Sequence, residues 1–325
     1  MNTPEQQDRP TGGDQDNGKQ DNWERDLISH IALDALKEQR RNRRWSIFFR
    51  FAALVYFLPI VILLIPHDWT SAGISTGKHT ALIEINGVIA PNAEASADNI
   101  IAGLRDAFKD DNTAGIILRI NSPGGSPVQA GYVNDEIRRL RGKYPQIPVY
   151  AVIMDVCASG GYYIAAAADK IYADKASLVG SIGVRMDGFG FVEAMHKLGV
   201  ERRLLTAGQY KGLLDPFSPL DPIVERHVHG LLNTIHRQFI DTVKRGRGKR
   251  LADDPRLYSG LIWTGEQGLK LGLVDALGNS SQVARDVFKA ENIVDYTVHE
   301  DYFDRFAKRL GTAMMALLSK APVLR

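Results

Sequence analysis

Apolar and polar positions divide the chain into a polar tail, one continuous apolar run and a long region of alternating patterns. Residues 1–22 carry almost no apolar side chains, so this segment cannot bury enough surface to become ordered. Residues 23–44 place apolar side chains at helical spacing, which predicts a short amphipathic helix. The side chains that share this face are Trp23, Leu27, Ile31 and Ala35. We therefore expect residues 1–44 to form a tail that is disordered at first and then helical.

The apolar run over residues 47–65 is close to the length that crosses the hydrocarbon core of a bilayer. Trp45 and Trp69 bracket it at positions typical of an aromatic belt, and a cluster of arginines precedes it. The positive-inside rule then places the N-terminus in the cytoplasm and the rest of the chain outside. A cleaved signal peptide and a buried core helix are the alternatives, but the basic lead is too long for a signal peptide. We expect a signal anchor over residues 45–66 and a polar linker over 67–78.

The region from residue 79 to about 300 alternates short apolar runs with helical patterns. Strands are predicted over 81–85, 116–120 and 149–154, and helices over 98–108, 129–140, 161–169 and 222–242. This alternation predicts an α/β fold with a largely parallel sheet. Residues 301–325 have an amphipathic pattern, which suits a packed terminal helix or a helix that contacts a membrane surface or a partner.

Composition excludes few partners. The chain has 40 Lys and Arg against 38 Asp and Glu, a net charge of +2, so nothing favours nucleic acid as a partner. The single cysteine, Cys157, cannot form an intrachain disulfide and is interpreted as a small apolar residue in a buried strand. His227, His229 and His236 do not form a convincing metal site, because the first two point in different directions on a helix.

The segment around Ser159 is the strongest indication of chemistry. Small residues surround this serine, and Gly160 and an apolar helical pattern follow it, as where hydrolases present a nucleophile at the start of a helix. A serine hydroxyl needs a base, and a lysine can serve only as a neutral amine, a state that burial favours. Lys211 lies among small and aromatic residues with no adjacent acid, which suits such a lysine.

A second glycine-rich turn, over residues 121–126, directly follows an apolar strand. Taken alone it is an ordinary strand-to-helix turn. Together with the turn after Ser159 it could bring backbone N–H groups to one place, as acyl transfer requires for the oxyanion of the tetrahedral intermediate. Ser181 lies in a third glycine-flanked turn. It could orient Lys211 by a hydrogen bond or be a plain turn residue.

Six motifs in this order resemble a known family. They are Asn121-Ser122-Pro123-Gly124-Gly125, Ala158-Ser159-Gly160-Gly161-Tyr162-Tyr163, Gly180-Ser181-Ile182-Gly183-Val184, Gln209-Tyr210-Lys211, Trp263-Thr264-Gly265 and Leu271-Gly272-Leu273-Val274-Asp275. As a set they are similar to the signal peptide peptidase A group of peptidase family S49, in its short single-unit form. The resemblance covers roughly residues 80–280 and does not include the N-terminal tail.

The resemblance implies a Clp protease/crotonase-like fold of repeated ββα units, a Ser-Lys dyad and no cofactor or metal. By matching positions, Ser159 is the nucleophile, Lys211 the general base, and the N–H groups of Gly125 and Gly160 form the oxyanion hole, with Ser181 as a candidate for orienting the lysine. The family also implies a homo-oligomeric ring, an octamer in the short form, in which Lys211 of one subunit completes the site of its neighbour. The implied substrates are remnant signal peptides, and the implied location is the bacterial cytoplasmic (inner) membrane, with the catalytic domain, residues 79–300, on its outer side.

Two other functions compete with this interpretation. A crotonase-like acyl-CoA enzyme would also build an oxyanion hole from two glycine turns, but it predicts catalytic acids and needs neither a Ser-Lys dyad nor an anchor. A catalytically silent membrane scaffold would retain the fold without the reaction, although Ser159 and Lys211 are both present.

Overall fold

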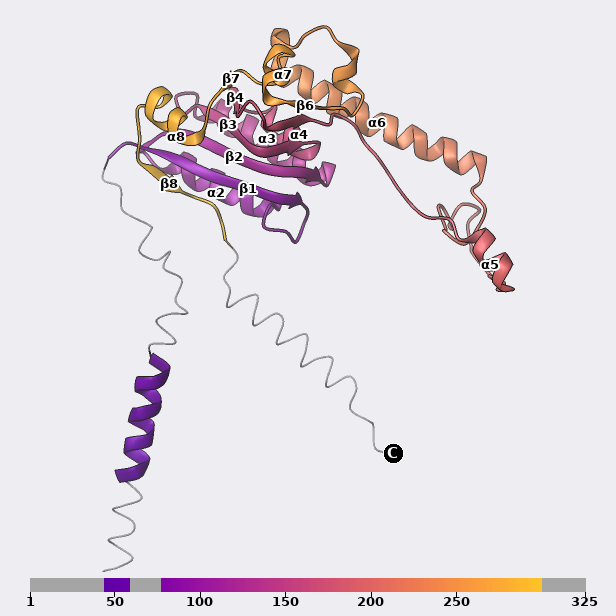
Figure 1. Cartoon of the computed structure of the whole chain (residues 1–325), viewed down its shortest axis with the longest axis horizontal. Coiled ribbons are helices and arrows are strands. Elements are labelled where there is room, and N and C mark those ends of the chain that lie inside the picture. The colour runs from indigo at the N-terminus through magenta and orange to yellow at the C-terminus, as the bar shows by residue number, and fades with distance from the viewer. Residues whose placement is uncertain (1–43, 59–76, 300–325) are drawn as a thin grey trace, which may run out of the picture. The chain divides into compact units, whose positions relative to one another are not determined.

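The computed structural model describes residues 44–58 and 77–299 (Figure 1). The chain divides into two units, Met1–Ala72 and Gly73–Arg325. In the first unit, residues 44–58 form a helix. No helix within the described residues is long and apolar enough to cross a membrane. The expected signal anchor over 45–66 lies only partly within these residues. The expected tail and C-terminal helix, and nearly all of the linker, lie outside them.

The second unit is built on a sheet that, within the described residues, has eight strands. The strand order is β6-β5-β3-β2-β1-β8, with β4 between β3 and β7. All pairings are parallel except that of β5 with β6, which confirms the predicted α/β fold. The strands are β1 (His79–Ile89), β2 (Thr113–Gly125), β3 (Val149–Ala158), β4 (Lys170–Ala173), β5 (Leu178–Gly180), β6 (Ile262–Thr264), β7 (Ala276–Leu277) and β8 (Ile293–Asp295).

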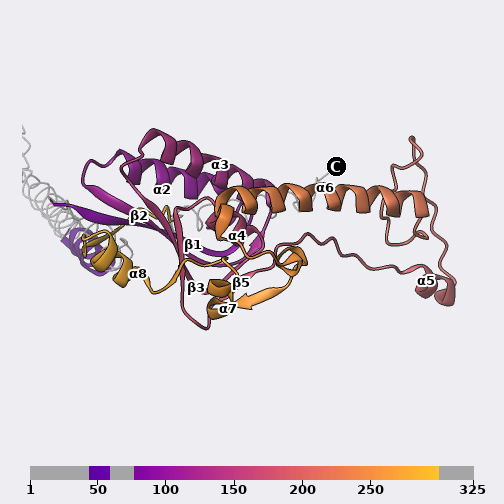
Figure 2. The same cartoon turned by 90° about the horizontal axis from the view of Figure 1, so that it is seen from above.

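Helices α2 and α3 lie along one face of the sheet, and α6 extends well beyond it (Figure 2). The helices are α2 (Ala97–Lys109), α3 (Pro127–Lys143), α4 (Gly160–Ala165), α5 (Val192–Leu198), α6 (Pro222–Arg247), α7 (Gly265–Lys270) and α8 (Ser280–Gln282), with short η segments at Gly248–Arg250, Pro255–Tyr258 and Val283–Val287. The expected helix over 161–169 is shorter than predicted, because the chain turns after Ala165 and the Asp169 N–H donates to the Val149 carbonyl at 2.8 Å.

The strands read as continuous apolar runs because both faces of the sheet are covered. Alternate side chains of a strand point to opposite faces. Ile83 belongs to the main core beneath the helices, whereas Leu82 belongs to a second cluster with Ile117 and Val283. Parallel sheets are usually buried on both faces, and their strands therefore read as nearly continuous apolar runs.

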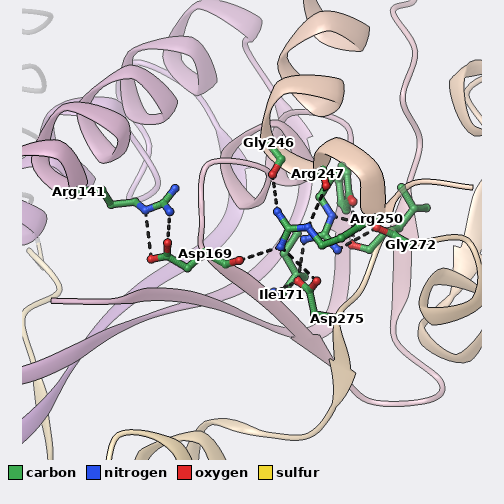
Figure 3. Close-up of polar contacts among 10 residues, drawn as sticks. Arg141, Asp169, Ile171, Gly246, Arg247, Arg250, Gly272 and Asp275 are labelled. Atoms are coloured by element: carbon green, nitrogen blue, oxygen red, sulfur yellow. Dashed lines mark hydrogen bonds and ion pairs between the residues drawn. The ribbon is translucent and has the colours of Figure 1, made fainter. Parts of the chain in front are cut away.

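A buried ion pair fixes the C-terminal end of α6 to the sheet (Figure 3). The Arg247 side chain is only 1% exposed, and its Nη1 lies 2.7 Å from Oδ2 of Asp275. Its Nε and Nη2 donate to the Gly272 carbonyl at 3.0 and 2.9 Å. Asp275 also accepts the Ile171 N–H of β4 at 2.7 Å. Each nitrogen of the Arg247 guanidinium thus donates to an acceptor, which is the condition under which a buried charge is tolerated.

Candidate active site

The carboxyl ends of three neighbouring parallel strands meet at one edge of the sheet. The register pairs Ser122 of β2 with Cys157 of β3, and Ala158 of β3 with Gly180 of β5. The chain therefore leaves β2 at Gly125, β3 at Ser159 and β5 at Ser181 in adjacent positions. Loops at the carboxyl ends of parallel strands are where α/β folds commonly place ligands.

Ser159 occupies a strained turn between β3 and α4. Its φ is 51° and its ψ is −120°, a conformation that costs a residue with a Cβ atom free energy. Its N–H donates to the Gly180 carbonyl at 2.9 Å, and its own carbonyl accepts the Tyr163 N–H at 2.9 Å. The Ser159 hydroxyl does not cap α4. Serine nucleophiles of α/β hydrolases sit on strand-to-helix turns of this kind.

Three glycines bring two backbone segments into direct contact beside Ser159. A Cβ on Gly124 would lie 2.7 Å from the Gly160 nitrogen and 2.8 Å from Cβ of Ser159. A Cβ on Gly160 would lie 3.2 Å from the Gly125 nitrogen. The amide nitrogens of Gly125 and Gly160 therefore lie close to one another next to the serine. Two such donors are what an oxyanion hole needs.

These turns line a cavity of about 800 Å³. Ser159, Gly125 and Gly160 form part of its wall, together with Ser181 and the residues that follow it. Helix α6 supplies Ile235, Gln238 and Phe239, and the 259–260 turn adds Ser259 and Gly260. The volume falls within the range of sites that hold a small-molecule or peptide ligand.

Lys211 lies elsewhere in the single chain. It belongs to an exposed turn, in which its N–H donates to the Gly208 carbonyl at 3.1 Å, and it does not line the cavity around Ser159. The segment between β5 and α6 runs away from the sheet and carries α5 at its far end (Figure 1). Within the described part of one chain, Ser159, Gly125, Gly160 and Ser181 come together and Lys211 does not. The burial expected for this lysine is therefore not provided by its own chain.

The segment that carries Lys211 exposes many large apolar side chains. A surface of this kind is unusual on a monomer and commonly marks an interface. We call residues 185–223 the arm. Its exposed apolar side chains are Met186, Phe189, Phe191, Leu198, Val200, Leu204, Leu205, Leu213, Leu214, Phe217, Leu220 and Ile223.

The remaining residues that the sequence made candidates for chemistry are buried or hydrogen-bonded within the fold. Cys157 is fully buried, and burial raises the pKa of its thiol well above the usual range, which makes it unreactive. Ser122 donates from Oγ to the Gly87 carbonyl at 2.6 Å, and Ser126 caps α3. Thr264 forms a capping box with Gln267 at the start of α7. Among the described residues, no group of three side chains could hold a metal ion.

Sequence reasoning missed the contribution of Tyr163 and of α6 to the site. The Tyr163 ring packs on Phe239 with centroids 5.1 Å apart, and its hydroxyl accepts a hydrogen bond from Thr242 Oγ1 at 3.0 Å. Both tyrosines of the Ser159 motif are thus used, since the buried Tyr162 hydroxyl donates to the Leu273 carbonyl at 2.8 Å. The adjacent tyrosines Tyr162 and Tyr163 were the feature of the sequence that could have indicated these contacts.

Comparison with known proteins finds a peptidase family and proteins named as proteases. A sequence model of peptidase family S49 matches residues 142–294. A Methanocaldococcus jannaschii protein named as a protease is 33% identical over 218 residues, which cover 66% of this chain and 69% of that protein. An Enterococcus faecium protein named as a signal peptide peptidase SppA is 29% identical over 234 residues, 70% of this chain and 67% of that protein.

A third match is to part of a longer protein. The chain is 45% identical over 185 residues to the Na⁺/H⁺ antiporter NhaA of Brucella melitensis. The match covers 57% of this chain and 25% of the antiporter. The chain thus spans about a quarter of the length of that relative.

Proposed function

The chain belongs to peptidase family S49, and on that premise we propose that it is a serine endopeptidase with Ser159 as nucleophile and Lys211 as general base. The observation that carries the proposal is the strained backbone of Ser159, which faces a cavity beside the amide nitrogens of Gly125 and Gly160. Strain at a single serine next to two backbone donors is typical of acyl-transfer sites.

The proposed reaction uses only groups of the protein and water. The neutral Lys211 amine takes the proton of the Ser159 hydroxyl as Oγ attacks the scissile carbonyl carbon. The Gly125 and Gly160 N–H groups donate to the oxyanion that forms. The C–N bond then breaks, and the Lys211 ammonium returns the proton to the leaving amine. Water attacks the resulting ester with the same lysine as base, which releases the new carboxylate and restores Ser159.

The proposal places Lys211 in the site of a neighbouring subunit. In one chain the lysine is exposed and does not line the Ser159 cavity, so a second copy must supply it if it is the base. The exposed apolar side chains of the arm provide a surface on which subunits could pack. The arrangement we propose is a homo-oligomeric ring, and the S49 resemblance implies eight subunits. Contact with a neighbour would also desolvate the lysine and favour its neutral form.

The proposed substrates are remnant signal peptides in the membrane. The E. faecium relative is named as a signal peptide peptidase, and the apolar run over residues 47–65 has the length of a membrane anchor. We propose a single-pass anchor over residues 45–66 in the bacterial cytoplasmic membrane, with the catalytic domain outside. This proposal also takes the α/β domain to be Clp protease/crotonase-like. A crotonase-like acyl-CoA enzyme or a silent scaffold would not require a strained, cavity-facing serine.

The direct test is hydrolysis of a quenched signal-peptide substrate by the full chain in detergent. Ser159→Ala and Lys211→Ala should each lower kcat by at least about 10³-fold, because nucleophile and base act as one unit. Lys197→Ala is the matched control, because it removes another exposed lysine of the arm, and it should retain activity. Unchanged activity of Lys211→Ala would exclude this lysine as the base.

Mixing the two inactive variants tests the sharing of the site between subunits. A mixed oligomer contains sites with Ser159 from one variant and Lys211 from the other. Activity should therefore return when the two are dissociated, mixed and reassembled. If activity stays absent although mixed oligomers form, the lysine does not act across subunits.

A further inference from the structure

The loop after β5 forms one wall of the Ser159 cavity but has no regular secondary structure. Residues 181–185 run without helix or strand, and Ser181, Gly183, Val184 and Arg185 line the cavity. The loop directly follows Gly180, the last residue of β5, whose carbonyl accepts the Ser159 N–H at 2.9 Å. Any movement of this loop would therefore change both the wall of the cavity and the backbone of the proposed nucleophile.

Two hydrogen bonds hold the loop, one through the Ser181 N–H and one through the Ile182 carbonyl. The Ser181 N–H donates to the Leu261 carbonyl at 2.8 Å. On α6, Nε2 of His236 lies 3.2 Å from the Ile182 carbonyl. His236 is half-buried, and the Ile182 side chain is fully buried. The histidine thus connects the loop to α6.

Helix α6 is a firm support for that contact because it is anchored independently of the loop. Phe239 packs on Tyr163, and Thr242 donates to the Tyr163 hydroxyl at 3.0 Å. One turn further on, Gly246 approaches the Ala166 carbonyl so closely that a Cβ would lie 1.9 Å from its oxygen. The buried Arg247 fixes the end of the helix. The contacts with Tyr163 and Ala166 join α6 to α4, the helix that starts next to Ser159.

We propose that His236 is a positioning residue, which holds the 181–185 loop against α6 by donating its Nε2–H to the Ile182 carbonyl. The proposal rests on the proposed peptidase function. His236 lies between Ile235 and Gln238, which line the same cavity, so its hydrogen bond joins two walls of one pocket. Both the neutral Nε2–H tautomer and the imidazolium can donate this bond. The contact therefore does not depend on which of these two forms is present.

The test compares three substitutions at His236 in the full-length protein. His236→Ala removes the donor. His236→Gln places an amide N–H near the position of Nε2, whereas the shorter His236→Asn does not reach it. Arg237→Ala is the control, because it changes an exposed neighbour on the same helix. The first readout is hydrogen exchange of the backbone amides, which needs no enzymatic activity. The second is kcat and KM for the quenched peptide.

In His236→Ala and His236→Asn, exchange should become faster at Ser159 and over 181–185, while α6 keeps its protection. In both variants kcat/KM should fall about 10- to 100-fold, mainly through kcat, as displacements of about 1 Å do in catalytic sites. His236→Gln should restore both readouts to within about threefold of the parent. Faster exchange with unchanged kcat/KM would overturn the positioning role, as would a Gln variant no better than Ala. If the parent hydrolyses no peptide, the proposed function is wrong. Unchanged hydrogen exchange over 181–185 in His236→Ala would separately refute the proposal that His236 holds this loop.

Discussion

Replacing Asp275 by alanine should destabilise the α/β domain more than any surface ion-pair change. The Arg247 guanidinium is 1% exposed and has one carboxylate partner at 2.7 Å, with its remaining contacts to a neutral carbonyl. Removing Asp275 leaves this charge buried without compensation. It also leaves the Ile171 N–H of β4 without the acceptor it has at 2.7 Å.

The expected loss follows from the burial of the pair. Breaking a buried ion pair by removing one partner costs about 3–5 kcal/mol. For a domain of this size, each kcal/mol lowers Tm by about 2–4 °C, so we expect Tm to fall by about 6–20 °C. The free energy of unfolding of a typical domain is only about 5–15 kcal/mol. Asp275→Ala should therefore be close to the limit of folding.

Thermal unfolding of the full chain, followed by circular dichroism, measures this effect. Asp286→Ala is the matched control, because its pair with Arg285 has side chains that are 49% and 53% exposed, and such pairs contribute about 0–1 kcal/mol. A double variant, Arg247→Met with Asp275→Leu, should recover much of the loss because no charge remains buried. A Tm for Asp275→Ala within about 2 °C of the parent would refute the reasoning.

Two further changes test the site and the acid sensitivity of the fold. Gly125→Ala would place a Cβ 2.1 Å from the Ile89 carbonyl oxygen, so peptide hydrolysis should fall at least about 10²-fold. Gly131→Ala is the control, because its Cβ would meet open space on α3, and it should keep full activity. Equal activities of the two variants would contradict the assignment of Gly125 to the oxyanion hole. The hydrogen bond from Arg139 lowers the pKa of Glu136 from 4.5 to about 2, although burial opposes it. The resulting stability is present above about pH 4.5 and is lost as the pH falls toward 2, so in urea titrations the parent should exceed Glu136→Gln by about 1–2 kcal/mol at pH 7. A difference that stays constant down to pH 2.5 would argue against this role of Glu136.

The long elements of the fold could be predicted from the sequence, because their apolar side chains repeat over many positions. The expected strands over 81–85, 116–120 and 149–154 lie within β1, β2 and β3. Strands β4 to β8 have only two to four residues each, which is too short for a periodic pattern to be recognised in the sequence. They form because long-range pairing to β1, β3, β4 and β5 provides their hydrogen bonds.

The position of the site was partly predictable, because motifs in the sequence mark the ends of the strands. Glycine-rich turns after apolar strands indicate where chains leave a parallel sheet, and this brought Ser159, Gly125, Gly160 and Ser181 to one edge. The sequence could not place Lys211, because its segment packs on no part of the sheet in its own chain. The contact of His236 with Ile182 depends on how α6 crosses the loop, and nothing in the local sequence determines that crossing.

The most direct test of the central claim is to find which residue reacts with a serine-directed fluorophosphonate. The full-length protein is treated in detergent, digested and analysed by peptide mass spectrometry. We predict a single adduct on Ser159, which is absent when the protein carries Ser159→Ala. An adduct on a different serine, or an unlabelled protein that still hydrolyses the peptide, would contradict the assignment of Ser159 as the nucleophile.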